Sequence, residues 1–593
     1  MITKKENEIN ILGLCTENAS SYHRIIIPLN AIHGTIVTID GVEYKYNCTI
    51  KKTPNEGKFF TEEDVKNYDI IAYNWIIVQD ANTLAVWAQK YNTKIWLDLD
   101  DYWVLPENHV NRTTKGIREF YPYLSTTIIR QVSTSDLVTT TNDLLLSDVV
   151  PYSSFCGSSF NNLPIGVGQF IPKPEIERKD VITLGVMGSV SHINDYQSIS
   201  GVWKKISADV EIKNKCRLLI IGADKGDVHW KKIIDMFSVN NFNVEVVEFA
   251  LPDRYMDLMN EVDVMLAPLE DSEFNERKSG LKLIECAIKG IPVLSNSAYA
   301  KKQDFNSYIL CKKMGDWYKS IKQLIKKHED GEYEFQKIGK TLSEQNLKNN
   351  NFEERINKIK AGIEYILTTP YTLDENLKIF GIMYDAEKQF TEYTPVLNEN
   401  KANPWRFEYS VMLNKLEEIK SFNKEDYVSF LSHKFPQKMG ISSKLLDKMF
   451  RQHKFQEWDV INLARNYWGS GENYLKFSYQ EHPHLEKILK MCLDKLEVEY
   501  IENPKVVTYS NFYIFKKDVM IDYIENWVKP ITDYMENEIW DLVNTDAIYP
   551  TGLSSEELEK YTGMTFYNNF TFVMERLVLF FIAHNNLKVK NIG

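Results

Sequence analysis

Long apolar runs are missing from this sequence of 593 residues. A membrane-spanning helix needs roughly 18 or more consecutive apolar residues, and no stretch approaches that length, so we expect no membrane span. The opening residues, Met1 to Glu8, include charged side chains where a secretion signal would need an apolar segment. These two absences predict a cytoplasmic protein.

Paired cysteines are missing as well. The seven cysteines are scattered, and no pair stands at the short spacing that metal sites use. An odd number of thiols fits a reducing compartment better than a disulfide framework. The sequence therefore predicts neither disulfides nor a bound metal.

The chain also has no excess of basic residues. Asp and Glu number 82 against 70 Lys and Arg, which gives a net charge of −12, and the pI is near 5.6. Proteins that wrap nucleic acids need basic residues to neutralise phosphates. This balance argues against DNA or RNA as a partner, although a local basic patch would still be compatible with it.

What the sequence does have is a regular alternation of short apolar runs with helical patterns, which is typical of parallel sheets with crossover helices. The length suggests three or four domains. A first set of strands is expected at Ile9–Leu14, Asp69–Tyr73, Lys94–Asp98 and Leu137–Thr140. A second set is expected at Ile182–Met187, Arg217–Gly222, Val244–Phe249, Val262–Ala267, Ile291–Ser295 and Tyr308–Cys311.

Proline-rich segments mark the expected boundaries. Pro172 and Pro174 follow a stretch without periodicity, so we place a junction near residues 165–180, and Pro370 marks the next one. The sequence thus predicts an α/β protein with two Rossmann-like domains, 1–175 and 176–370. A third α/β domain, 371–593, is expected to be rich in helix.

The segment 263–297 reads as strand, loop, helix and strand, with the helix expected from Lys278 to Lys289 and ended by Gly290. Its charged residues fall on one face: Lys278, Lys282, Glu285 and Lys289. Lysines at a helix N-terminus are disfavoured by the helix dipole unless an anion is bound there, and helix N-termini bind phosphates. A solvated helix face is the alternative.

A second turn of interest follows the strand Ile182–Met187. Gly188 and Ser189 are small enough to let backbone N–H groups approach a diphosphate. We expect the next helix to be capped by Asn194 or Asp195. His192 is either a ligand of the bound anion or simply a residue at the start of the helix.

These motifs resemble the donor-binding domain of retaining GT-B glycosyltransferases, in a branch with Phe-Asn-x-x-Lys-Ser. The run from Asp263 to Ser295 carries the resemblance. It implies two facing Rossmann-like domains, a ribose held by Glu285 and a diphosphate met by the turn with Lys278 and Ser279. Further donor-binding residues would be Gly188, Ser189, Asn275 and Lys282. Many members have a second glutamate eight positions before the first, where this chain has Arg277.

Two segments of the first domain would then lie on the acceptor side. Ser21, Tyr22 and Arg24 follow the first strand in a turn that resembles the acceptor loop of these enzymes, with helix capping by Ser20 or Ser21 as the alternative. Carboxylates follow the strand Lys94–Asp98, at the end where open α/β sheets place ligands: Asp98, Asp100 and Asp101. The alternative for these acids is an N-cap with surface charges.

The resemblance implies sugar transfer from a nucleotide-sugar with retention, catalysed by Asp100, Asp101, His192 and Lys278. A UDP-sugar donor is expected from its frequency in the family, with no further cofactor and no metal. The expected acceptor is a glycan. Glycosylation of a hydroxymethylated DNA base is an alternative that the acidic pI disfavours. Arg277 favours a second alternative, a non-catalytic binding protein.

Residues 371–593 resemble uncharacterised modules of polysaccharide-building enzymes, which look like reduced sugar-nucleotide transferase folds. The segments that carry this resemblance are Tyr427–Phe435, Glu481–Leu485 and Tyr509–Phe515. An Asp-x-Asp motif is lacking, so no second metal-dependent active site is predicted. We read His482 and His484 as part of a structured turn. Acceptor recognition, oligomerisation and a second transfer activity all remain open for this domain.

Overall fold

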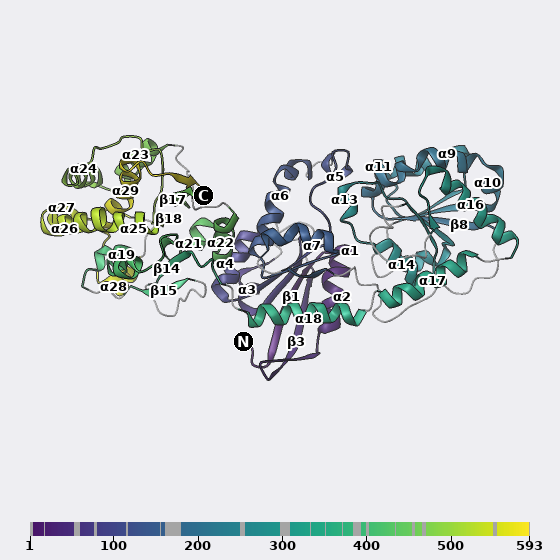
Figure 1. Cartoon of the computed structure of the whole chain (residues 1–593), viewed down its shortest axis with the longest axis horizontal. Coiled ribbons are helices and arrows are strands. Elements are labelled where there is room, and N and C mark those ends of the chain that lie inside the picture. The colour runs from purple at the N-terminus through teal and green to yellow at the C-terminus, as the bar shows by residue number, and fades with distance from the viewer. Residues whose placement is uncertain are drawn as a thin grey trace. The chain divides into compact units, whose positions relative to one another are not determined.

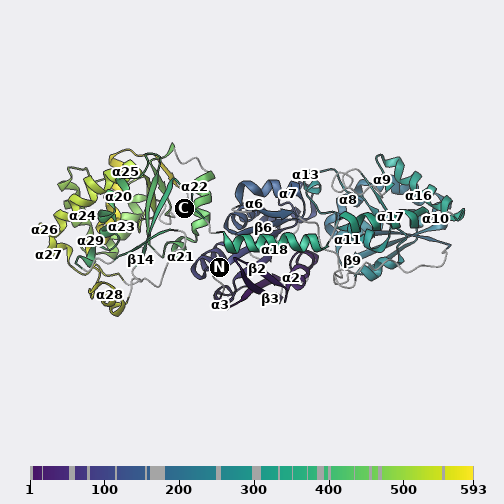
Figure 2. The same ribbon diagram turned by 60° about the horizontal axis from the view of Figure 1, so that its bottom comes forward.

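The structure, a computed structural model, divides the chain into two compact units, Met1–Pro370 and Tyr371–Gly593 (Figures 1 and 2). It describes residues 4–16, 18–52, 60–75, 80–113, 117–153, 156–159, 180–248, 255–296, 309–331, 334–349, 352–369, 372–383, 393–398, 402–432, 434–452, 457–464, 470–549 and 554–591. The expected junction near 165–180 lies almost entirely outside these residues. Among the helices described, none is both long and apolar enough to cross a membrane.

The first unit begins with a seven-stranded sheet in the order β2-β3-β1-β4-β5-β6-β7. Only β2 and β3 pair antiparallel. The strands are β1 (Glu8–Cys15), β2 (Ile36–Ile39), β3 (Val42–Lys52), β4 (Ile70–Asn74), β5 (Lys94–Leu99), β6 (Leu137–Thr140) and β7 (Cys156–Ser159). The helices are α1 (Ala19–Ser21), the π-helix η1 (Tyr22–Ile26), α2 (Ile27–Ile32), α3 (Glu62–Asn67), α4 (Ala81–Tyr91), α5 (Val110–Thr113), α6 (Ile117–Thr134) and α7 (Asp143–Val149). Because helices cover both faces, β4 is buried along its whole length.

A second, six-stranded sheet follows in the order β10-β9-β8-β11-β12-β13, with every pair parallel. Its strands are β8 (Ile182–Met187), β9 (Cys216–Ala223), β10 (Val244–Glu248), β11 (Val264–Ala267), β12 (Val293–Ser295) and β13 (Ile309–Leu310). The helices are α8 (Ile193–Ser198), α9 (Ser200–Ala208), α10 (Val210–Lys215), α11 (Val228–Phe237), α12 (Tyr255–Leu258), α13 (Glu273–Glu276), α14 (Leu281–Lys289), α16 (Met314–Glu329) and α17 (Glu334–Asn349).

The last helix of the first unit, α18 (Phe352–Thr368), crosses back to the first sheet (Figure 1). Ile356, Ile359 and Ile363 lie in one hydrophobic cluster with Ile9 and Leu137 of β1 and β6. The chain therefore visits the first Rossmann-like half twice, although α18 follows the second half in the sequence.

The second unit is built on a third sheet of six strands, β15-β14-β16-β18-β17-β19, in which β18 is antiparallel to both neighbours. The strands are β14 (Leu377–Met383), β15 (Thr394–Leu397), β16 (Tyr427–Ser432), β17 (Val460–Asn462), β18 (Tyr513–Lys516) and β19 (Val589–Asn591). The helices are α19 (Glu408–Asn414), α20 (Leu416–Lys420), α21 (Phe435–Met439), α22 (Ser443–Gln452), α23 (Gly471–Glu481), α24 (Leu485–Lys495), α25 (Lys517–Tyr523), the π-helix η8 (Ile524–Val528), α26 (Lys529–Asn537), α27 (Trp540–Val543), α28 (Ser555–Thr562) and α29 (Asn569–His584). Helix α29 is apolar on nearly all sides because it lies in the centre of this unit's core.

The predicted fold class is confirmed: two Rossmann-like halves are followed by an α/β region rich in helix. Some local predictions were wrong. Helix α14 begins at Leu281 rather than Lys278, with Gly280 at its N-cap position, and α13 occupies part of the expected loop. Asn194 and Asp195 do not cap α8, whose N-cap is His192. Asn18, not Ser20 or Ser21, accepts the capping hydrogen bond at α1.

Candidate functional site

The candidate site lies at the carboxyl ends of β8 and β11, which pair directly in the middle of the second sheet. From β8 the chain runs to β9 on one side, whereas β11 leads to β12 on the other. Open α/β sheets bind ligands in the crevice at such a switch point. The turn after β8 and the loop before α14 therefore lie where a ligand is expected.

The turn after β8 requires glycine at its first position. Gly188 has φ of 142°, a conformation that L side chains rarely adopt. A Cβ at this position would lie 2.7 Å from His192 Cδ2 and 3.3 Å from Lys282 Nζ. The backbone, the imidazole and the lysine thus converge closely, and Ser189 beside them is exposed.

Asp195 joins this turn to the loop after β11. Its Oδ2 lies 2.6 Å from His192 Nδ1, and its Oδ1 accepts hydrogen bonds from Asn275 Nδ2 at 2.9 Å and from the Glu270 backbone N–H at 2.8 Å. Burial by itself would raise the pKa of Asp195, but the hydrogen bond from His192 and the charge of Lys278 hold it well below its usual range. An ionised carboxylate therefore fixes both loops, a role that reading Asp195 as a helix cap missed.

His192 is a neutral imidazole at physiological pH. Burial, followed by the nearby charges of Lys282 and Lys278, lowers its pKa to about 3. The Asp195 carboxylate selects the tautomer with a proton on Nδ1, which leaves the Nε2 lone pair beside Gly188. In this state His192 offers an acceptor, and it becomes a cation only if a bound anion raises its pKa.

Lys282 stands in the first turn of α14 with only 8% of its surface exposed. Within the described part of the chain no carboxylate lies within ion-pair distance of its Nζ, and the centre of the Tyr196 ring lies 5.7 Å from the ammonium. Burial, partly offset by Asp195 and reinforced by Lys278, lowers the pKa of Lys282 to about 7. A buried lysine without a carboxylate is costly and is typical of a site for an anion.

The charged face of α14 is not solvated. Glu285 and Lys289 are 2% and 3% exposed, and Lys289 donates to Asn260 Oδ1 at 2.9 Å. The solvated-face interpretation of this helix was therefore wrong. Lys278 and Ser279 belong to the turn before the helix, where Lys278 Nζ lies 4.8 Å from the centre of the Phe274 ring.

Glu285 faces the first Rossmann-like half. Its Oε1 lies 3.8 Å from His23 Nε2 of η1, with both side chains almost fully buried. No described residue donates a hydrogen bond to Oε1, and burial raises the pKa of Glu285 well above its usual range. Sequence reasoning missed His23, although it lies between two predicted residues, because the π-helix that turns it inward is not a local pattern.

Arg277 connects the two halves. Its guanidinium forms an ion pair with Asp148 of α7 and lies 4.4 Å from the centre of the Tyr102 ring. Asn142, which follows β6, donates to the Arg277 carbonyl at 2.7 Å. Arg277, which stands where the sequence resemblance implies a second glutamate, is therefore bound by residues of the first half.

Two of the residues predicted for the acceptor side pair with each other. Arg24 Nε and Nη2 donate to the two oxygens of Asp98, each at 2.8 Å, and neither side chain is exposed. Thr139 donates to Asp98 as well, at 2.6 Å. Arg24 and Asp98 therefore bind η1 to the carboxyl ends of β5 and β6.

Asp100 lies at the same edge, one residue beyond β5, and is 8% exposed. Its Oδ1 accepts hydrogen bonds from Asn74 Nδ2 and Trp75 Nε1, both at 3.0 Å, two partners that the sequence did not single out. Asp101 next to it is half-buried, as is Tyr22 in η1. Ser21 is fully buried, and its Oγ accepts from the Thr16 N–H at 3.2 Å.

His109 is a further residue that sequence reasoning missed. Its ring packs edge-on against Phe274 with centroids 5.0 Å apart, and burial together with the charge of Lys278 lowers its pKa to about 4. It thus brings a neutral side chain of the first half next to the lysine turn before α14. In the described residues no group of three or more His, Cys, Asp or Glu is arranged to hold a metal.

The sequence matches no protein-family model and no curated protein. About 60% of the chain is similar in fold to the solved structures of a sucrose-phosphate synthase and of trehalose-phosphate synthases. Sucrose-phosphate synthase from Thermosynechococcus elongatus is 12% identical, with 60% of this chain and 99% of that chain covered and a TM-score of 0.42. The UDP-forming α,α-trehalose-phosphate synthase of Burkholderia xenovorans is 10% identical, with 61% and 100% covered and a TM-score of 0.39.

TarM from S. aureus, solved with UDP, is 13% identical, with 50% of this chain and 55% of that chain covered and a TM-score of 0.35. At such identities and scores the likeness concerns the outline of the fold, so a function has to rest on the site itself.

Proposed function

We propose that this chain transfers a sugar from a nucleotide-sugar, a UDP-sugar by preference, to a hydroxyl group of an acceptor glycan, with retention of configuration. The observation that carries the proposal is Lys282: a buried lysine beside Gly188, at the switch point of the second sheet and in the first turn of α14. A diphosphate at this place would supply the missing negative charge.

The donor would be held by parts of the second half. The backbone around Gly188 and Ser189 and the turn with Lys278 and Ser279 approach the diphosphate, while the amide of Asn275, fixed by Asp195, lines the loop. Asn275 Oδ1 has no hydrogen-bond partner among the described residues, so it is available to a donor hydroxyl. Glu285 binds the ribose hydroxyls.

The chemical step breaks the bond between the anomeric carbon and the phosphate oxygen, and the diphosphate leaves with the electron pair. Lys278 and Lys282 stabilise the charge that develops on it. The anion also raises the pKa of His192, whose imidazole then donates a hydrogen bond to the leaving phosphate. The acceptor oxygen attacks from the same face, and its proton passes to a departing phosphate oxygen.

The acceptor hydroxyl would be oriented by Asp100 and Asp101, with Ser21 and Tyr22 nearby. Arg24 and Asp98 act through these groups by holding η1 and the end of β5 in place. The ion pair of Arg277 with Asp148 closes the two halves over the reactants, which excludes water and limits hydrolysis of the donor.

The first test is a thermal-shift screen of the full chain with UDP, GDP, ADP, CMP and their common sugars. Binding raises the melting temperature by mass action, so a shift with one base identifies the donor class. Lys282→Met should remove the shift, whereas Lys289→Met, a buried lysine of the same helix that bonds Asn260, should keep it.

Transfer is then measured with the identified donor. Lys278→Ala should lower turnover more than donor affinity, and an unchanged rate would remove Lys278 from the leaving-group role. No shift with any nucleotide would favour a non-catalytic binding protein. Transfer to a hydroxymethylated DNA base, with none to a glycan, would replace the proposed acceptor.

A further inference from the structure

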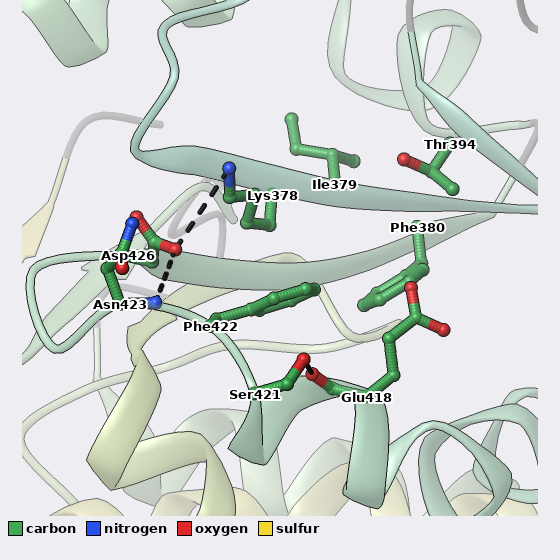
Figure 3. Close-up of a pocket in the computed structure, with 9 residues that line it drawn as sticks. All are labelled: Lys378, Ile379, Phe380, Thr394, Glu418, Ser421, Phe422, Asn423 and Asp426. Atoms are coloured by element: carbon green, nitrogen blue, oxygen red, sulfur yellow. Dashed lines mark hydrogen bonds and ion pairs between the residues drawn. The ribbon is translucent and has the colours of Figure 1, made fainter.

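The second unit contains a cavity of about 270 Å³ that the proposed transfer does not use (Figure 3). Strand β14 forms one wall with Lys378 and Phe380, and the segment that ends α20 and leads to β16 forms the other. This second wall contributes Glu418, Phe422, Asn423 and Asp426. Residues from two segments that are separate in the sequence therefore line one cavity.

The cavity lies at the amino ends of parallel strands. Lys378 is the second residue of β14, and Asp426 immediately precedes the first residue of β16. Reacting ligands of open α/β sheets lie at the opposite, carboxyl edge. The position therefore favours recognition of a ligand rather than catalysis.

The carboxylate of Asp426 lines this cavity. The residue is 1% exposed, and its Oδ2 accepts from the Asn423 backbone N–H at 2.9 Å and lies 4.0 Å from Lys378 Nζ. Its Oδ1 has no hydrogen-bond partner among the described residues. A buried acceptor without a donor costs on the order of 1–3 kcal/mol, so a ligand hydroxyl or amine that reaches this carboxylate would be bound by it.

The opposite side of the cavity is aromatic with a polar rim. Phe422 is half-buried and stacks on Phe380 with centroids 6.1 Å apart and an angle of 17°. Thr394, Ser421 and Asn423 are exposed around it. The negative face of an aromatic ring attracts the C–H face of a sugar ring, while polar side chains around it bind the hydroxyl groups.

The charges around the cavity balance. Lys378 lies next to Asp426, and Lys415 donates to Glu418 Oε2 at 2.6 Å. With two cations facing two carboxylates, neither an anion nor a cation is favoured. The volume lies below the 300–1,000 Å³ that is usual for drug-sized ligands, so only a small ligand fits.

We propose that this cavity is a binding site for one neutral pyranose residue, with the ring stacked on Phe422 and a hydroxyl donating to the carboxylate of Asp426. Such a site would tether a glycan to the second unit at a place separate from the carboxyl edge of its sheet. It does not depend on the donor site in the first unit.

The test is saturation-transfer difference NMR on the full chain with the methyl glycosides of glucose, galactose and N-acetylglucosamine. At least one should give a signal, and Phe422→Ala should weaken binding about tenfold. Phe477→Ala removes another aromatic side chain of the second unit, 46% exposed on α23, and should leave binding unchanged. Asp426→Asn keeps the volume of the side chain and should weaken binding as well. Thermal melting checks that each variant is folded.

Competition distinguishes this site from the proposed donor site. A sugar signal that persists with saturating UDP supports the second-unit site, and it would do so even if no nucleotide binds the first unit. A signal that UDP abolishes would assign the sugar to the donor site and overturn the proposal. The proposal would also be overturned if no glycoside gives a signal, or if the signal is undiminished in both Phe422→Ala and Asp426→Asn. Binding of only a cation, tetramethylammonium, or only an anion, phosphate, would overturn it too.

Discussion

His23 and Glu285 belong to opposite Rossmann-like halves, and their Nε2 and Oε1 atoms lie 3.8 Å apart in an almost fully buried contact. The carboxylate proposed to hold the ribose therefore faces a side chain of the other half. A ribose can reach Glu285 only if this contact opens. If Glu285 holds a ribose as proposed, donor binding is coupled to a movement of the two halves, as in many enzymes that close around substrates.

Glu285→Gln should weaken UDP binding about tenfold, because an amide accepts less well than a carboxylate from ribose hydroxyls. Binding of inorganic pyrophosphate, which has no ribose, should stay unchanged in the same variant. Isothermal titration with both ligands measures the two affinities. Equal losses for UDP and pyrophosphate would refute the ribose assignment.

UDP affinity should fall as the pH rises from 7 to 9. Lys282 has a pKa of about 7 in the unoccupied site, and a bound diphosphate raises it, so binding takes up a proton in this range. Below pH 7 the lysine is already charged and this dependence ends. Because one proton is taken up, the UDP affinity should fall by at most tenfold per pH unit. Titrations in buffers of different ionisation enthalpy measure the proton uptake, and Lys282→Met should abolish it.

The same buried charge predicts a gain in stability for Lys282→Met. An uncompensated ammonium in the core destabilises the folded state, so its replacement by a chain of similar shape should raise the free energy of unfolding by about 1 kcal/mol at pH 6. At pH 6, below the pKa of about 7, most of the lysine is charged, and the gain should shrink between pH 7 and 10. Thermal melting at both ends of this range measures the change. A gain in stability that does not depend on pH would contradict the interpretation of Lys282 as a buried charge.

Arg277→Ala should lower kcat more than donor affinity, because its partner Asp148 lies in the other half and the ion pair favours closure. Asp148→Ala should have the same effect, and the double variant should be little worse than either single variant. Arg277→Glu, which introduces the glutamate that the sequence resemblance implies for this position, should be the worst variant because it faces Asp148. Activity above that of the natural chain in Arg277→Glu would contradict the closure role.

Arg24→Met and Asp98→Asn should each destabilise the first unit by about 3–5 kcal/mol, because each leaves a buried partner unpaired. Arg24→Met combined with Asp98→Leu removes both charged groups and should be less harmful than Arg24→Met alone. Urea unfolding, monitored by a fluorescence signal from the first unit, measures the difference in the free energy of unfolding between these variants. Additive losses would show that the two side chains act separately.

Much of the fold was predictable because its cause is local. Strands such as Ile182–Met187 and Leu137–Thr140 were placed to the residue, since a short run rich in aliphatic and β-branched residues marks a strand. Helix starts were less predictable. The capping of α8 was assigned to Asn194 or Asp195, yet Asp195 turns inward to bind His192 and Asn275. A capping motif in the sequence does not reveal that the side chain forms its hydrogen bonds with a loop that is distant in the chain.

The sequence by itself determined which side chains are available, where many of the strands lie, and that small residues follow the strand Ile182–Met187. Only the tertiary structure decided that Lys282 is buried, that Arg24 pairs with Asp98, that His23 meets Glu285, and that α18 returns to the first sheet. The reason is physical. Periodicity reports the neighbours of a residue within a few positions, whereas these contacts join residues far apart in the chain, and their geometry depends on sheet order and on how the two halves approach each other.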